Sequence, residues 1–93
     1  MSGQVISKQF EVEGENGFHL RPITLLVQLA GRFESDITIV KDGNSVGTRS
    51  VMELLLLGAQ HGDVLEVSIS GSDSSEALIA VEELFKEIAE SND

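Results

Sequence analysis

The chemistry that this sequence can support centres on His19, which lies close to an arginine and to the chain's only proline. Before it, Phe10 and Val12 alternate with acidic residues, a pattern typical of a half-buried strand. After it, apolar residues recur at helical spacing over residues 23–30. Pro22 is best tolerated in the first turn of a helix, where a missing N–H removes no hydrogen bond. The sequence therefore predicts that His19 lies at, or just before, a helix N-terminus.

This position suits a histidine that carries phosphate. The backbone N–H groups and the macrodipole of a helix N-terminus both favour negative charge. An imidazole in water titrates near pH ~6.5, so at neutral pH it can offer a lone pair that attacks phosphorus and forms a phosphoramidate. Arg21 supplies a planar fork that can bind two phosphate oxygens, and Gly17 would keep side chains out of a partner's approach. The spacing indicates phosphoryl chemistry on the imidazole of His19.

Composition limits the other possibilities. The chain has 93 residues, so residues 1–93 are expected to form one small domain without room for an enclosed substrate cavity. It has no cysteine and no metal-ligand constellation near His19, so we expect neither a metal nor a cofactor. With 16 acidic residues against 6 basic ones, the formal net charge is −10, which argues against nucleic acid and anionic membranes as partners. The same charge favours a monomer.

The sequence also bears on cellular location. The N-terminus does not resemble a signal peptide, and the longest apolar run, residues 54–59, is too short to cross a bilayer. The lack of cysteine fits a reducing compartment. We therefore expect a cytoplasmic protein.

The sequence divides into elements in the order βαββαβα. Strands are predicted at residues 5–12, 36–39, 45–48 and 65–70, and helices at residues 20–31, 51–57 and 74–89. Asp42-Gly43 is a strong hairpin signal between the second and third strands. The last helix is predicted to bury a stripe made of Ala77, Val81, Leu84 and Ile88. The hairpin and the short connections favour an antiparallel or mixed sheet, and hence an α+β fold built as a two-layer α/β sandwich.

Two segments resemble signatures of one known family. Gly17-Phe18-His19-Leu20-Arg21-Pro22 resembles the active-site signature of HPr, the histidine-containing phosphocarrier family of the bacterial phosphoenolpyruvate-dependent phosphotransferase system. Residues 49–58, which begin Arg49-Ser50-Val51-Met52, resemble the same family's signature around its regulatory serine. The resemblance covers nearly the whole chain. It implies an open-faced β-sandwich whose four-stranded, mostly antiparallel sheet carries three helices on one face.

The resemblance assigns roles to the residues around His19. It implies that His19 accepts a phosphoryl group from Enzyme I charged by phosphoenolpyruvate, and that Arg21 stabilises the phosphate charge. The helix N-terminus, with Gly17, Leu20 and Pro22, would form the phosphate site. The phosphoryl group would pass to a IIA-type acceptor, so the protein would be a stoichiometric carrier rather than a stand-alone enzyme.

The match leaves the branch of the family open. Family members commonly carry alanine after the proline, where this chain has the larger Ile23. The acidity of the chain and the stretch Ser50-Val51-Met52 give some resemblance to the nitrogen-related branch, as opposed to the branch that feeds sugar transport.

Ser50 has two interpretations. As an N-cap, its hydroxyl would accept a hydrogen bond from the next turn, with Glu53 completing a capping box. The resemblance implies a second role as a regulatory phosphosite, acted on by a serine kinase/phosphorylase in some branches. A phosphoserine at a helix N-terminus is compatible with the helix dipole.

The helix after Ser50 is too apolar to be fully buried. The run over residues 51–57 contains six large apolar side chains in about two turns. If the family architecture holds, some of Val51, Met52 and Leu55 remain exposed next to His19. Such a patch marks a surface for partner docking.

Two other functions are compatible with parts of the sequence. The first is a regulatory docking module of the same fold, switched by phosphorylation of Ser50; relatives of that type lack the active histidine, which is present here. The second is a small acylphosphatase-like hydrolase, which would give His19 no role. The other histidine, His61, lies in a predicted surface turn without comparable surroundings.

Overall fold

The computed structural model describes residues 4–90, and its elements follow the predicted order. They are β1 (Gln4–Glu11), α1 (Leu20–Ala30), β2 (Asp36–Lys41), β3 (Asn44–Gly47), α2 (Val51–Leu56), β4 (Val64–Gly71) and α3 (Ser74–Glu90). Each predicted strand and helix is confirmed, and its ends differ from the prediction by at most two residues.

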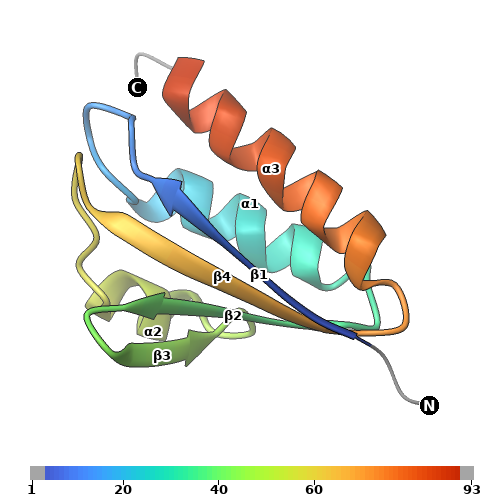
Figure 1. Ribbon diagram of the computed structural model, residues 1–93. Coiled ribbons are helices and arrows are strands. Elements are labelled where there is room, and N and C mark those ends of the chain that lie inside the picture. Colours follow the sequence, from blue (N-terminus) through green and yellow to red (C-terminus); the bar gives the residue numbers. More distant parts are fainter. Residues whose placement is uncertain (1–3, 91–93) are drawn as a thin grey trace.

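The strands form one four-stranded antiparallel sheet in the order β1-β4-β2-β3. Ile69 on β4 lies opposite Ile6 on β1 and opposite Ile37 on β2, so apolar side chains line up across neighbouring strands. The predicted hairpin joins β2 and β3, and Asp42 and Gly43 both have positive φ angles (52° and 83°). Figure 1 shows the helices on one side of this sheet, which confirms the two-layer, open-faced arrangement.

The core lies between the sheet and the helices. Alternate residues of β4, Leu65, Val67 and Ile69, are fully buried. The predicted stripe of α3 is buried against them, as are Ile23, Leu26 and Leu29 of α1. Phe85 on α3 stacks on Phe10 of β1, with ring centroids 4.6 Å apart, and on Phe18, at 5.9 Å. Phe18 directly precedes His19, so this stack ties the segment before α1 to the core.

The start of α3 lies at the opposite end of the molecule from the loop before α1 (Figure 1). One carboxylate holds it in place. Asp73, just before α3, accepts hydrogen bonds from the N–H groups of Glu34 and Ser35, both at 2.9 Å, and from the Ser35 hydroxyl. The Ser35 hydroxyl and the Glu34 N–H hold the pKa of the Asp73 carboxyl below its usual range. The start of α3 and the turn after α1 are thereby held together.

Two loops pair to form the end of the molecule that carries His19. The Val12 N–H donates to the Asp63 carbonyl at 2.9 Å, and the Gly62 N–H donates back to the Val12 carbonyl at 2.8 Å. The Phe18 N–H donates to the Ala59 carbonyl at 3.1 Å. Backbone hydrogen bonds to residues 59–63 therefore hold both ends of the segment 12–18 in place.

Gly17 is required by this pairing. Its φ is +70°, in the left-handed region that favours glycine. A Cβ at this position would lie 3.0 Å from the Ala59 carbonyl oxygen and 3.0 Å from the Gln60 Cα. The missing side chain thus faces the neighbouring loop, so close backbone packing explains this glycine better than clearance for a partner does.

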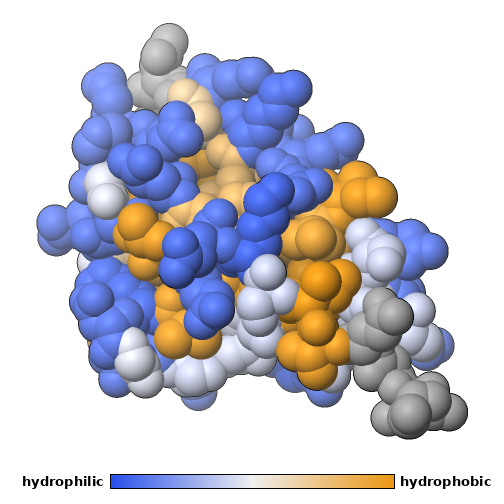
Figure 2. Space-filling view, in the orientation of Figure 1, coloured by the Kyte–Doolittle hydropathy of each residue, from blue (hydrophilic) through white to orange (hydrophobic). Residues whose placement is uncertain are grey.

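The surface is mostly polar. On the face shown in Figure 2, hydrophobic side chains gather in separate groups between polar ones. Over residues 4–90, no helix combines the length and the hydrophobicity needed to span a bilayer.

We predict that Gly17→Ala destabilises the protein more than Gly58→Ala does. Both glycines have nearly the same φ (+70° and +69°), but a Cβ at Gly58 meets only one atom within 4 Å, at 3.9 Å. Left-handed strain alone accounts for a loss of about 1–2 kcal/mol in either variant. The backbone clash adds to this in Gly17→Ala, for a total loss of about 2–4 kcal/mol. Urea unfolding measures both values; equal losses would show that the two loops are not closely packed at Gly17.

Candidate functional site

His19 occupies the N-cap position of α1 but does not cap the helix with its side chain. Its backbone is extended, with φ −98° and ψ −168°, and its carbonyl accepts a hydrogen bond from the Ile23 N–H at 3.1 Å. The imidazole makes no capping hydrogen bond. A histidine that served only as a cap would turn its ring toward the first-turn N–H groups. Here the half-buried ring is left available for other chemistry.

The N-terminus of α1 is electropositive in an acidic chain. The first N–H groups of a helix have no carbonyl partner within it, and they carry the positive end of the macrodipole. Pro22, in the first turn, has no N–H to contribute, as the sequence predicted. The first turn of α1 contains no acidic side chain that would neutralise this end.

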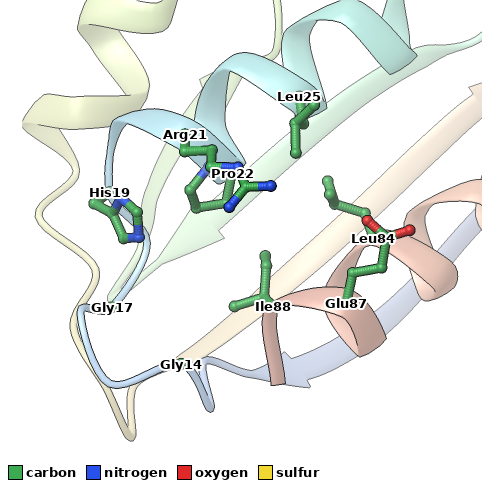
Figure 3. A pocket seen from close by; sticks show the side chains of 9 residues that line it. All are labelled: Gly14, Gly17, His19, Arg21, Pro22, Leu25, Leu84, Glu87 and Ile88. Atoms are coloured by element: carbon green, nitrogen blue, oxygen red, sulfur yellow. The ribbon is translucent and has the colours of Figure 1, made fainter. Parts of the chain in front are cut away.

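One pocket brings together four of the five residues predicted to form the phosphate site. Gly17, His19, Arg21 and Pro22 all line it. In Figure 3, the Arg21 side chain extends from α1 into the pocket, between His19 and the residues of α3. Leu20 points elsewhere: it is 57% exposed and lines a separate shallow depression that His19 and Arg21 also border.

The far wall of the pocket comes from α3, which the local motif does not reveal. Leu84, Glu87 and Ile88 line this wall. The last turns of α3 lie close to the loop before His19. This is seen at Gly14, where an added Cβ would be 3.0 Å from Ile88 Cγ2 and 3.2 Å from the Ile88 carbonyl oxygen. Helical periodicity predicts Leu84 and Ile88 as core residues, but in the sequence Glu87 looks like any solvated acid.

His61 has a structural role that its sequence surroundings did not suggest. It is exposed, as predicted for a turn residue, but its Nδ1 lies 3.1 Å from the Gly14 carbonyl oxygen. The Asp63 carboxylate accepts from the Gln60 N–H at 2.8 Å and tightens the same turn. His61 therefore helps to hold the loop that precedes His19.

Ser50 lies outside the pocket of His19. It is the N-cap of α2, and its hydroxyl accepts a hydrogen bond from the Glu53 N–H at 3.2 Å, as predicted. It borders a groove between the C-terminal half of α1, β2 and the start of α2. In the same groove, Arg49 Nη2 lies 3.7 Å from Asp36 Oδ1 in a solvent-exposed ion pair. Its role as a phosphosite stays a prediction.

The apolar run of α2 is largely exposed. Leu54 is the buried residue of this helix. Of the three predicted docking residues, Met52 is 64% exposed, Leu55 is 37% exposed, and Val51 is half-buried. Leu56, which the prediction omitted, is the most exposed large apolar residue in the described part of the chain, at 79%. Because α2 packs against α1, this surface adjoins the helix that begins beside His19.

The site contains no built metal centre within residues 4–90, where no group of three or more His, Cys, Asp and Glu side chains could hold an ion. The pocket brings together one imidazole, one guanidinium and a helix N-terminus, with the Glu87 carboxylate in its far wall. The first three of these groups suit an anion that forms a covalent bond to the imidazole.

Comparison with known proteins agrees with this chemistry. Residues 6–87 match the family described as "PTS HPr component phosphorylation site". The phosphocarrier protein HPr from Bacillus anthracis str. Ames is 38% identical, with a TM-score of 0.80 over 86% of this chain and 95% of that one. HPr-C-His from Thermoanaerobacter tengcongensis is 32% identical, with a TM-score of 0.86 over 92% and 97%. Crh, the catabolite repression containing protein of Bacillus subtilis, is 34% identical, with a TM-score of 0.70 over 88% and 94%.

The match extends well beyond the motif around His19, since it includes the order of the elements and the topology of the sheet. The chain therefore belongs to the HPr family, the phosphocarrier proteins of the phosphotransferase system.

Proposed function

We propose that His19 accepts a phosphoryl group from phospho-Enzyme I, itself charged by phosphoenolpyruvate, and passes it to a IIA-type acceptor. The observation that carries this proposal is the position of the His19 imidazole. It lies at the N-terminus of α1 without making a capping hydrogen bond, and no acidic side chain occupies the first turn. Such a helix end stabilises the negative charge of a phosphoryl group. Arg21 lines the same pocket and adds a fixed positive charge.

The transfer needs few groups from this chain. One ring nitrogen of neutral His19 forms a bond to phosphorus while the bond between phosphorus and the donor breaks, and the other ring nitrogen keeps its proton. The main requirements are in-line positioning and stabilisation of the equatorial oxygens, which the helix N-terminus and Arg21 supply. Onward transfer restores the starting imidazole. The protein then acts as a stoichiometric carrier in the cytoplasm, where phosphoenolpyruvate is available.

A second candidate function follows from the similarity to Crh, the catabolite repression containing protein of Bacillus subtilis. In this alternative the chain is a docking module that is switched by phosphorylation of Ser50. The half-buried Ser50 is already used as the N-cap of α2, and this role is sufficient to explain it. The presence of His19 favours the carrier. Lack of labelling at Ser50 by a cognate serine kinase/phosphorylase would remove the switch.

We further propose that the exposed apolar side chains of α2 form the docking surface for both partners. Its members are the exposed Met52, Leu55 and Leu56 and the half-buried Val51, an unusual amount of exposed apolar surface for a helix of six residues. An acidic chain that exposes such a patch is suited to partners with an apolar socket and a basic rim.

We predict that Met52→Asp lowers the rate of phosphoryl transfer at subsaturating partner concentration about tenfold, the effect expected if Met52 is among the few interface residues that each contribute more than about 1 kcal/mol. The matched control is Ile79→Asp, which introduces the same charge at an apolar residue of similar exposure (58% against 64%) on α3. Stopped-flow or quench kinetics with Enzyme I measures both rates. Equal rates for the two variants would eliminate α2 as the docking surface.

The acceptor site is tested by incubation with labelled phosphoenolpyruvate and Enzyme I. We expect acid-labile, base-stable label on the wild type and on His61→Ala, and none on His19→Ala. His61→Ala removes the only other imidazole of the chain. Label that persists in folded His19→Ala would contradict the proposal.

A further inference from the structure

Glu87 is the acidic residue in the wall of the pocket that contains His19 and Arg21. It comes from α3, on the side of the pocket away from the imidazole. In Figure 3, its carboxylate extends from α3 toward the side of the pocket formed by α1. An anion-accepting pocket with a carboxylate in its wall combines opposing charges.

The position of Glu87 is unfavourable for α3 itself. The last turn of this helix contains no basic residue, and its C-terminal end carries the negative pole of the macrodipole. A carboxylate near that pole is repelled. Lys or Arg would be the stabilising choice, and it would also reduce the strong net negative charge of the chain.

The end of α3 cannot easily move away from the pocket. Ile88, the next residue, is buried, and its backbone carbonyl approaches Gly14 so closely that a Cβ there would lie 3.2 Å from it. Leu84, one turn earlier, is also buried and lines the same pocket. Packing on both sides therefore holds Glu87 at the rim of the site.

We propose that Glu87 is a positioning residue that raises the phosphoryl-transfer potential of phospho-His19. This inference rests on the proposed carrier function. A phosphoryl group adds a charge of about −1.5 to −2, and it is repelled by the exposed carboxylate of Glu87 in the pocket wall. Glu87 also competes with the phosphoryl group for electrostatic attraction to Arg21, which lines the same pocket. Both effects destabilise the phosphorylated form relative to the free imidazole.

The consequence is a carrier that gives up its phosphoryl group readily. Two opposing charges set the balance: Arg21 and the helix N-terminus help the group to arrive, and Glu87 helps it to leave. The chemical step is unchanged, since one bond to phosphorus forms on the acceptor as the bond to the His19 nitrogen breaks.

The test compares Glu87→Gln with Glu83→Gln. Glu83 is one turn earlier on α3 and exposed, and it borders the neighbouring groove between α1 and α3 rather than the pocket of His19. Both variants remove one charge and keep the side-chain shape. Each protein is equilibrated with Enzyme I at a fixed ratio of labelled phosphoenolpyruvate to pyruvate, and the ratio of phosphorylated to free protein is measured.

We expect Glu87→Gln to increase that ratio about three- to tenfold at low ionic strength, the size expected of a partly screened charge interaction near the surface. Glu83→Gln should change it less than about twofold. Added salt should shrink the effect of Glu87→Gln, which a purely structural role would not do, and Glu87→Asp should retain most of the wild-type behaviour.

The outcomes distinguish a failure of the proposed role of Glu87 from a failure of the proposed carrier function. A labelled wild type with an unchanged ratio in Glu87→Gln would overturn the role of Glu87 and leave the carrier function intact. An equal increase in Glu87→Gln and Glu83→Gln would overturn it too, because only net charge would then matter. A wild type that takes no label from a competent Enzyme I would overturn both proposals.

Discussion

The pairing of two loops is the constraint on which the site depends. Backbone hydrogen bonds join Val12 to Gly62 and Asp63, and Phe18 to Ala59. They are possible because Gly17 adopts a left-handed conformation and brings no side chain to the contact. Phe18 then stacks on Phe85 in the core, which anchors the chain directly before α1. His19 is held at the helix N-terminus by this geometry rather than by hydrogen bonds of its own ring.

Charge explains how an acidic protein can accept phosphate. The net charge of −10 opposes the arrival of an anion at most of the surface. The first turn of α1 escapes this effect locally, because it lacks acidic side chains and presents a helix dipole together with Arg21. The end of α3 supplies the opposing charge of Glu87 from across the pocket. A transferable phosphoryl group requires that neither side dominate, since a strongly held group would not be passed on.

Local chemistry was enough to predict much of this structure. Pro22 and the change of periodicity placed His19 at a helix start, Asp42-Gly43 marked the hairpin, and Ser50 was identified as an N-cap. The strand order and the far wall of the pocket depend on tertiary packing, which no local pattern encodes. The roles of Glu87 and His61 were therefore not predictable: Glu87 lines a pocket with residues far away in the chain, and His61 bonds to the carbonyl of the distant Gly14. The residue-level roles within the family remain proposals that these contacts support.

The most direct measurement of the central claim is an amide ¹H–¹⁵N NMR spectrum of the protein before and after phosphorylation. If the phosphoryl group sits on His19 against the N-terminus of α1, the largest shifts belong to the amides of Gly17, Phe18 and Leu20, with those of Ser50 and α2 much less affected. Because a phosphate oxygen polarises an N–H that donates to it, the Leu20 amide proton should move downfield. Shifts centred on Ser50 and Glu53, or spread evenly over the sheet, would contradict an acceptor site built on the first turn of α1.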